Sequence, residues 1–195
     1  MKLDMDIFKA KGATMDPVKG RLLISEPILP DMIFSRSVVF ITDDTGNKHS
    51  GLILNKAAGI KLGKVLSEFK GADFDVYLGG PVEIERLFYL HSYGDLIKGA
   101  IKVTDKLWWG GDFSAVKEML HAGVLKPDKI MFFLGYSGWS EGQLKDELDD
   151  GAWLVADVPS EFVFSDRESK WSRSLNFVDA KYQIWRNFPE DPALN

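Results

Sequence analysis

The chain has 195 residues, 45% of them hydrophobic and 27% charged, which suits one soluble domain with a sizeable core. Its formal net charge of −5 argues against a nucleic-acid-binding protein, because phosphate recognition relies on a positive surface, and direct nucleic-acid binding is not expected. Cysteine is absent, which excludes disulfides, thiolate metal sites, iron–sulfur clusters and a cysteine nucleophile.

The sequence carries no signal for a membrane. Asp4 and Asp6 stand where a signal peptide would have its apolar segment. The longest apolar run, residues 130–134, is far shorter than the roughly 20 residues that a spanning helix needs. We therefore expect a cytoplasmic protein with no membrane partner.

Three regions are predicted along the chain. Residues 1–19 are expected to form a loosely attached N-terminal arm. The alternative is a short helix with Met5, Ile7 and Phe8 on its apolar edge, and Met15 is an alternative start. Residues 20–186 form the domain. Residues 187–195 form a C-terminal tail with two prolines.

The first half of the domain reads mainly as strands. Strands are expected at 21–25, 35–42, 50–55, 75–78 and 85–91, with 100–104 as the neighbour of the last. Residues 43–48 have turn composition, so the second and third strands should form a hairpin. A break at residues 57–59 precedes an expected helix over 62–69. A second helix is expected over 113–122, capped by Asp112 and ended by Gly123.

The second half is organised around residues 135–144 (GYSGWSEGQL). A buried strand is expected at 129–134, then a sharp strand-to-helix turn, then a helix over 144–150. Ser140 and Gln143 have capping-box spacing, and Gly151 should end that helix. Further strands are expected at 152–156 and 161–164. A helix with Trp171, opened by a Ser165–Glu168 capping box, and a last helix over 178–185 should complete the domain. The elements do not alternate strictly, which favours an α+β fold, a single domain with a mixed, largely antiparallel sheet flanked by helices.

No motif commits the chain to a reaction. His49, His91 and His121 lack any paired ligand spacing, so no metal is expected. Ser137 resembles a nucleophile elbow, but Trp139 stands where the second glycine of that motif belongs, so no catalytic residue is predicted. No cofactor motif is present, because the glycine-rich turns lack the lysine and hydroxyl of a phosphate loop.

Two charge patterns have ordinary explanations. The acids of residues 146–150 fall on a helix face that should be solvated, opposite Leu144 and Leu148. The first third of the domain is relatively basic, and a scattered surface is the default interpretation. The alternative is a small positive patch for an anionic partner.

The sequence resembles the YqgE/AlgH family of uncharacterised bacterial proteins. The resemblance lies in residues 20–27 (GRLLISEP), 51–55 (GLILN), 79–82 (GGPV), 135–139 (GYSGW) and 151–154 (GAWL), and it spans roughly residues 20–185. It implies one α/β domain with a mixed sheet, a cytoplasmic location, and no established activity or cofactor. Some members are described as transcriptional regulators. Ser137 departs from the alanine frequent in the family, and the hairpin turn lacks the histidine expected after its first strand.

We therefore expect a non-enzymatic binding or transcriptional-regulatory protein with an unknown protein or small-molecule partner. Its candidate surface joins the ends of several strands, because polar, aromatic and glycine residues gather there: Arg36, Asn55, Lys56, Gly79, Gly80, Pro81, Tyr136 and Trp139. The alternative is an enzyme or small-molecule-binding protein that uses the turns at residues 79–81 and 135–139.

Overall fold

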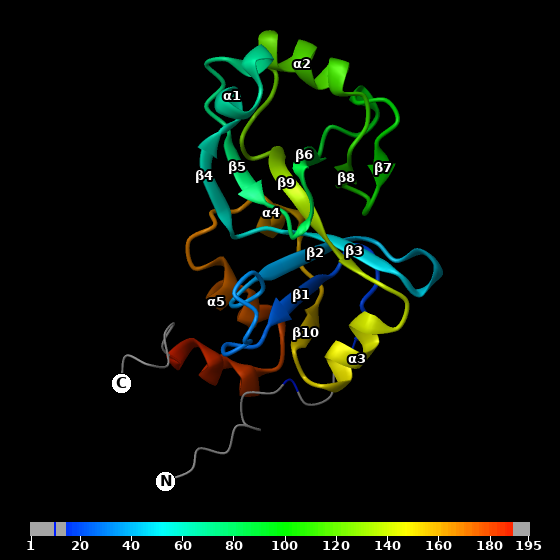
Figure 1. Ribbon diagram of the computed structural model, residues 1–195, viewed down its shortest axis with the longest axis vertical. Helices are drawn as coiled ribbons and strands as arrows, with labels where there is room; N and C mark the ends of the chain where they lie inside the picture. The colour runs from blue at the N-terminus through cyan, green and yellow to red at the C-terminus, as the bar shows by residue number, and fades with distance from the viewer. Residues whose placement is uncertain (1–9, 11–14, 189–195) are drawn as a thin grey trace.

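The computed structural model describes residue 10 and residues 15–188, which form one α+β domain (Figure 1). Most of the predicted N-terminal arm, including the alternative short helix near residues 5–8, and most of the predicted C-terminal tail lie outside the described residues. The boundaries of the arm and tail stay predictions.

One part of the sheet is fully antiparallel. Its strands run in the order β10 (Trp153–Ala156), β1 (Leu22–Ser25), β2 (Val38–Asp43), β3 (His49–Ile53) and the C-terminal half of β9 (Ile130–Trp139). The β2–β3 hairpin is confirmed, and its turn contains the 3-10 helix η2 (Thr45–Asn47).

The other part of the sheet is built on the N-terminal half of β9. Antiparallel to it runs β6 (Val82–His91), followed by β8 (Trp108–Trp109) and β7 (Ile101–Lys102). On the other side of β9 lies β5 (Asp75–Leu78), parallel to it, with β4 (Ala57–Lys61) beyond. The predicted pairing of residues 100–104 with 85–91 is wrong, since β8 lies between β7 and β6. The break expected at residues 57–59 is part of strand β4.

Strand β9 joins the two parts, and it corrects the main local prediction. The segment expected to turn sharply after residue 134 continues as strand to Trp139 (Figure 1). Gly135 has φ +68°, and the register between β6 and β9 shifts between Leu87 and Val82, so the strand contains an irregularity rather than a turn. The glycines therefore serve a bend inside the central strand.

Five short α-helices and five 3-10 helices complete the described chain. They are α1 (Leu62–Val65), η3 (Ser67–Phe69), η4 (Gly94–Leu96), α2 (Phe113–His121), α3 (Gln143–Asp149), α4 (Ser160–Val163), α5 (Lys170–Ser174), η5 (Leu175–Phe177) and η6 (Ala180–Asn187), together with η2. The Asp112 cap of α2 is confirmed, because its carboxylate accepts from the Ser114 N–H at 2.9 Å.

Other helix predictions need correction. The single helix expected over 62–69 is interrupted by Leu66, which is extended. Residues 161–164 are not a strand, because α4 begins at Ser160 directly after Pro159. The Ser165–Glu168 capping box does not form, because the Glu168 N–H bonds to Asp166 and α5 begins at Lys170. The last helix is present as the 3-10 helix η6.

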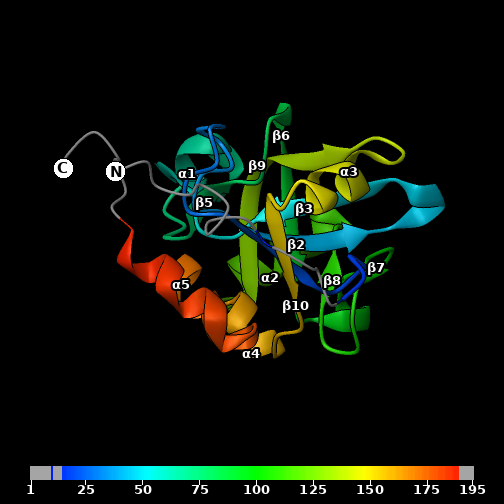
Figure 2. The same ribbon diagram turned by 90° about the horizontal axis from the view of Figure 1, so that it is seen from below.

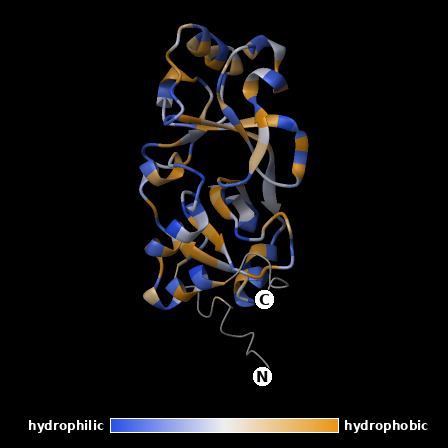
Figure 3. Cartoon of the chain, turned by 90° about the vertical axis from the view of Figure 1, so that its left-hand side faces the viewer, coloured by the Kyte–Doolittle hydropathy of each residue, from blue (hydrophilic) through white to orange (hydrophobic). Residues whose placement is uncertain are grey.

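The antiparallel part of the sheet is covered on both faces, with α5 and η6 on one side and α3 on the other (Figure 2). Every residue of strand β1 is apolar or small and is buried, because both faces of the strand are covered. Leu22 and Ile24 pack toward Trp171 of α5, and Leu23 packs toward Leu144 of α3. Figure 3 shows hydrophobic and hydrophilic residues following one another along helices, strands and connections alike.

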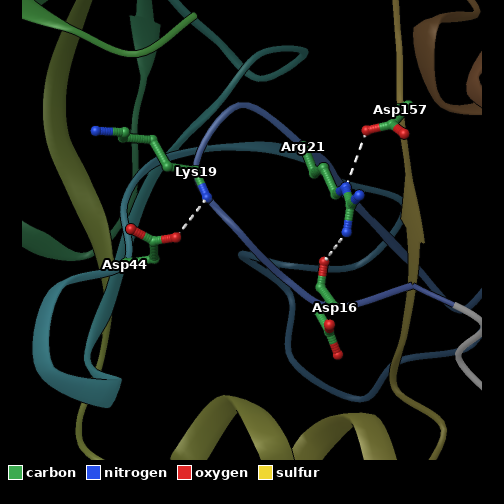
Figure 4. A network of polar contacts seen from close by, with 5 residues as sticks. All are labelled: Asp16, Lys19, Arg21, Asp44 and Asp157. Carbon is green, nitrogen blue, oxygen red and sulfur yellow. Dashed lines mark hydrogen bonds and ion pairs between the residues drawn. The ribbon is translucent and has the colours of Figure 1, made fainter.

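The segment that leads into β1 is fixed by polar contacts (Figure 4). Asp44 accepts from the Lys19 N–H at 3.0 Å, and the Arg21 guanidinium bonds to Asp157 at 2.9 Å and to the Asp16 carbonyl at 2.7 Å. These contacts attach residues 16–21 to the β2–β3 turn and to the end of β10.

Candidate functional site

A cleft of about 880 Å³ lies where helix α5 and η6 meet the ends of β2 and β3. We call it the basic cleft. Its lining residues are Met32, Ser35, Arg36, Asn55, Lys56, Arg167, Ser169, Lys170, Trp171, Ser172 and Arg186. Within residues 10 and 15–188 the lining includes five cationic and no acidic side chains, although the whole chain carries a net charge of −5. The structure thus concentrates positive charge in one concave place.

Asn55 fixes one wall of the basic cleft. Its side-chain oxygen accepts from the Val38 N–H, and its amide donates to the Arg36 carbonyl, both at 2.9 Å. The two bonds clamp the backbone of Arg36, which has a φ of +48°, a conformation that residues other than glycine rarely adopt. Such strained backbone persists where surrounding contacts hold it, and here it directs Arg36 toward α5.

The guanidinium of Arg36 connects the two walls. It lies over the Trp171 ring, 4.6 Å from the centroid, and its Nη2 donates to the carbonyl of Phe188. The Trp171 indole is itself anchored, since its Nε1 donates to the Ser25 carbonyl at 2.9 Å. A stacked, half-buried guanidinium keeps its plane fixed, which suits recognition of a flat or tetrahedral anion.

The remaining cations surround this pair. Lys56 donates to the Ser35 carbonyl at 2.7 Å, and Arg186 donates to the Ser172 carbonyl at 2.8 Å and to the Asn176 side chain. Arg167 lies 3.6 Å from the carboxylate of Asp75. Arg167 and Arg186 are exposed, so their charges face solvent at the rim of the basic cleft.

Lys170 supports the wall from within. Its side chain is fully buried, and its ammonium donates to the carbonyls of Phe162 at 3.2 Å and Val163 at 2.8 Å at the end of α4. Burial, with a smaller contribution from Arg173, lowers the pKa of Lys170 to about 7. Its charge is therefore directed at α4, away from the mouth of the cleft.

The other predicted site residues lie elsewhere. Gly79 and Gly80 pack against β9, where a Cβ on Gly79 would lie 2.2 Å from the Gly135 carbonyl oxygen. Ser137 is buried there and donates to the Gly79 carbonyl at 3.0 Å. The close backbone approach explains these glycines without a ligand. Pro81 is exposed beside them.

Tyr136 and Trp139 project to opposite sides of β9 and share no surface. Tyr136 is half-buried against the ring of Phe88. Trp139 is only 4% exposed and packs with Phe34 and Trp153 beneath α3.

The carboxylate of Glu147 on α3 holds this aromatic group in place. Its Oε2 accepts from the indole of Trp139 at 2.9 Å and from that of Trp153 at 2.7 Å. Asp146, Asp149 and Asp150 are exposed, as the helical pattern predicts, but Glu147 is partly buried and structural.

Other polar groups give no second site of equal character. Another cleft, of about 620 Å³ near α4 and β8, mixes acids with Lys106 and Lys129. His91 is buried; its Nδ1 accepts from the Tyr93 N–H, its Nε2 donates to the Gly110 carbonyl, and burial lowers its pKa. Among residues 10 and 15–188, no three His, Asp or Glu side chains are grouped as metal ligands.

The sequence identified three of the eleven described residues that line the basic cleft. Arg36, Asn55 and Lys56 were predicted, whereas Arg167, Lys170, Trp171, Ser172 and Arg186 were not. These five come from a segment more than 100 residues away, so only the fold brings them to the same place. The sequence feature that could have indicated them is the cationic composition of residues 167–186, which hold five Lys or Arg together with Trp171.

No helix in the described ranges has both the length and the apolar character needed to cross a bilayer.

Comparison with known proteins supports the resemblance seen in the sequence. The model of a family described as AlgH-like matches residues 22–183. A UPF0301 protein of Parabacteroides distasonis is 39% identical over 193 residues, covering 97% of this chain and 98% of its own. One of Bacteroides thetaiotaomicron is 39% identical over the full length of both chains.

Two solved structures are similar in fold. The solution structure of the AlgH protein from Pseudomonas aeruginosa matches with a TM-score of 0.70 and 27% identity, covering 90% of this chain and 97% of that one. The crystal structure of a Corynebacterium diphtheriae protein matches with a TM-score of 0.76 at 20% identity, covering 96% and 100%. None of these names states a biochemical activity.

Proposed function

The chain belongs to the AlgH-like family of uncharacterised proteins, and from that premise we propose that it is a binding protein whose basic cleft takes an anionic ligand. One observation carries the proposal: the cleft has a volume of about 880 Å³, and its described lining holds Arg36, Lys56, Arg167 and Arg186 without an acid, besides Lys170, whose ammonium is turned to α4. Clustered like charges repel one another, and a bound anion relieves that repulsion.

The arrangement favours a ligand with more than one negative group. Arg36 and Lys56 belong to one wall, and Arg167 and Arg186 belong to the other. Phosphates and carboxylates accept the parallel N–H bonds that arginine donates. Ser169 and Ser172 add polar groups from α5 and its start, so a small polyanion such as a phosphate ester or a polycarboxylate fits the lining chemistry.

The same lining supports binding rather than catalysis. The part of the lining that the structure describes contains no histidine and no carboxylate to act as general base toward Ser35, Ser169 or Ser172. Lys170 has a pKa near neutrality, but its ammonium is turned to the carbonyls at the end of α4. We extend the proposal to a cytoplasmic regulatory protein that responds to an anionic metabolite, in keeping with the role implied by the family resemblance.

The rival proposal places an enzyme or binding site at the turns of residues 79–81 and 135–139. Pro81 and Tyr136 are accessible there, which favours it. Against it, the two backbones are in direct contact at Gly79, Gly80 and Gly135, which leaves no room between them for a ligand.

Calorimetric titration with pyrophosphate at low salt tests the proposal. The variant R167Q/R186Q removes the two exposed cations of the basic cleft. We expect its affinity to fall about tenfold, because each solvent-exposed charge pair contributes up to about 1 kcal/mol. Binding should also weaken as salt is added.

The matched control is R86Q/K98Q, which removes the same charge from exposed positions outside the basic cleft. It should bind pyrophosphate as the wild type does. Equal affinity of R167Q/R186Q and wild type, or equal losses in both variants, would refute a localised anion site.

A further inference from the structure

The basic cleft is larger than a small inorganic anion requires. Its volume is about 880 Å³. Pockets of about 300–1,000 Å³ bury organic ligands of drug size, so pyrophosphate would occupy only a part of this space. The lining outside the cations therefore indicates what else the ligand carries.

One rim of the basic cleft presents an apolar side chain on a fixed turn. Met32 lines the cleft and is 89% exposed. The Asp31 carboxylate accepts from the N–H groups of Ile33 at 2.8 Å and Phe34 at 3.3 Å. The Asp31 carbonyl accepts from the Ser35 N–H at 2.7 Å. The backbone of this turn is thus held in place, while the thioether of Met32 remains in solvent beside the cations.

A planar group lines the same wall. The guanidinium of Arg36 is stacked over the ring of Trp171, and both residues line the cleft. A guanidinium plane offers a stacking surface to a flat aromatic ring, in addition to the N–H donors at its edge. Methionine adapts its shape to an aromatic surface and makes favourable sulfur–ring contacts. Met32 and Arg36 together therefore suit a flat ring rather than a second phosphate.

From these observations we infer that the anion of the basic cleft is a nucleotide. Its phosphate binds Arg167 and Arg186, and its base lies between Met32 and the Arg36 guanidinium. The inference rests on the proposed function, since it names the class of anion that the same cleft takes. It assigns Met32 to recognition of the base, and the exposed arginines to recognition of the phosphate.

Two ligands that differ only in the base test the inference. Adenosine monophosphate and ribose 5-phosphate share the sugar and the phosphate, so calorimetric titration of both at low salt measures the contribution of the base. We expect adenosine monophosphate to bind about tenfold more tightly, because each stacked base adds to the affinity. Butyl phosphate has an apolar group that is not flat, and it should bind no more tightly than ribose 5-phosphate.

The variant M32Q locates the base in the cleft. It keeps the length of the side chain and removes its apolar end. Its affinity for adenosine monophosphate should fall about three- to tenfold, because the sulfur–ring contact is lost. Its affinity for pyrophosphate should equal that of the wild type, because pyrophosphate has no base.

The matched control is L96Q, which replaces another exposed apolar side chain. Leu96 is 67% exposed on η4 and is not among the residues that line the basic cleft. The L96Q protein should bind adenosine monophosphate as the wild type does. The melting temperatures of both variants should equal that of the wild type, since neither side chain is buried.

The outcomes separate the two proposals. Tighter binding of adenosine monophosphate than of ribose 5-phosphate, with a loss in M32Q but not in L96Q, supports the nucleotide. Equal binding of the two ligands, an equal gain with butyl phosphate, or no effect of M32Q overturns it. Pyrophosphate binding that depends on Arg167 and Arg186 would then leave the anion site standing. If neither pyrophosphate nor any phosphate ester binds, the proposed function fails, and the nucleotide fails with it.

Discussion

Glu147 is the residue on which the aromatic packing beneath α3 depends. One carboxylate oxygen accepts from the indoles of Trp139 and Trp153, whose rings are 5.9 Å apart. The other oxygen accepts from Gln143 at 3.0 Å. A single acid thus satisfies two otherwise buried donors and links α3 to strands β9 and β10.

Replacement of Glu147 by leucine should destabilise the protein by about 2–4 kcal/mol, because each unsatisfied buried donor costs about 1–3 kcal/mol. Glu147→Gln should cost less, since its amide oxygen still accepts. Urea unfolding at neutral pH measures both, with Glu141→Gln, exposed just before α3, as the control. A Glu147→Leu protein as stable as wild type would show that the indole bonds contribute nothing.

Lys170 makes stability depend on pH in a definite direction. Its pKa is about 7 in the folded protein and near 10.5 when unfolded, so between these values the unfolded chain binds the extra proton. Stability due to this residue must then rise as pH increases from about 7 to about 10, by up to about 1.4 kcal/mol per pH unit.

The comparison of wild type with Lys170→Met isolates this contribution. As pH rises from about 7 to about 10, the free energy of unfolding of the wild type should increase relative to that of Lys170→Met. A difference that stays level, or that shrinks with increasing pH, would mean that Lys170 remains charged in the folded state.

Among the elements, β9 is the strand that joins the two parts of the sheet, because it pairs with β3, β5 and β6 along its length. Gly135 allows the backbone of β9 to lie close to the backbone of Gly80 and Val82. A Cβ there would lie 2.6 Å from the Gly80 oxygen and 2.7 Å from the Val82 oxygen, and its φ is +68°.

Gly135→Ala should therefore cost well over the roughly 1 kcal/mol of left-handed strain alone, about 3 kcal/mol or more. Gly59→Ala is the matched control, because Gly59 has φ +73° and nothing within 4 Å of the methyl group that alanine would add. It should lose only about 1 kcal/mol. Thermal unfolding compares them, and equal losses would contradict a steric role for Gly135.

The elements also show what the sequence could predict. Strands β1, β2, β3, β5 and β10 were predicted from runs of hydrophobic residues, and helix α2 was predicted from its N-cap. Each of these signals is contained in a short stretch of sequence, so it can be recognised without knowledge of the fold. Residues 135–139 were predicted as a turn, since glycines locally favour one. Their strand conformation depends on pairing with β3 and β6, whose partners lie 50 or more residues away. Residues 161–164 were misassigned because aromatic and β-branched residues occur in strands and in buried helices alike.

At the scale of the whole molecule, the basic cleft is a product of topology. Residues near positions 36, 56, 170 and 186 meet because α5 and η6 fold back over β1 and β2 (Figure 2). The three predicted residues Arg36, Asn55 and Lys56 were recognisable as polar groups at strand ends. Their partners on the other wall were not, since no local pattern indicates which surface a short C-terminal helix covers.

The arrangement also reconciles an acidic chain with an anion site. Acids outnumber cations on α3, whereas cations gather in the basic cleft. Within a concave site, local charge outweighs net charge, since salt screens exposed charges beyond about 8–10 Å. A negative net charge therefore argues against extended nucleic-acid binding without arguing against a small anion.

The most direct test maps where pyrophosphate binds, by following backbone amide resonances during its titration into the wild-type protein. We predict saturable shifts at Arg36, Lys56, Ser172 and Arg186. Shifts confined to residues 79–81 and 135–139, or the absence of any saturable shift, would contradict an anion site in the basic cleft.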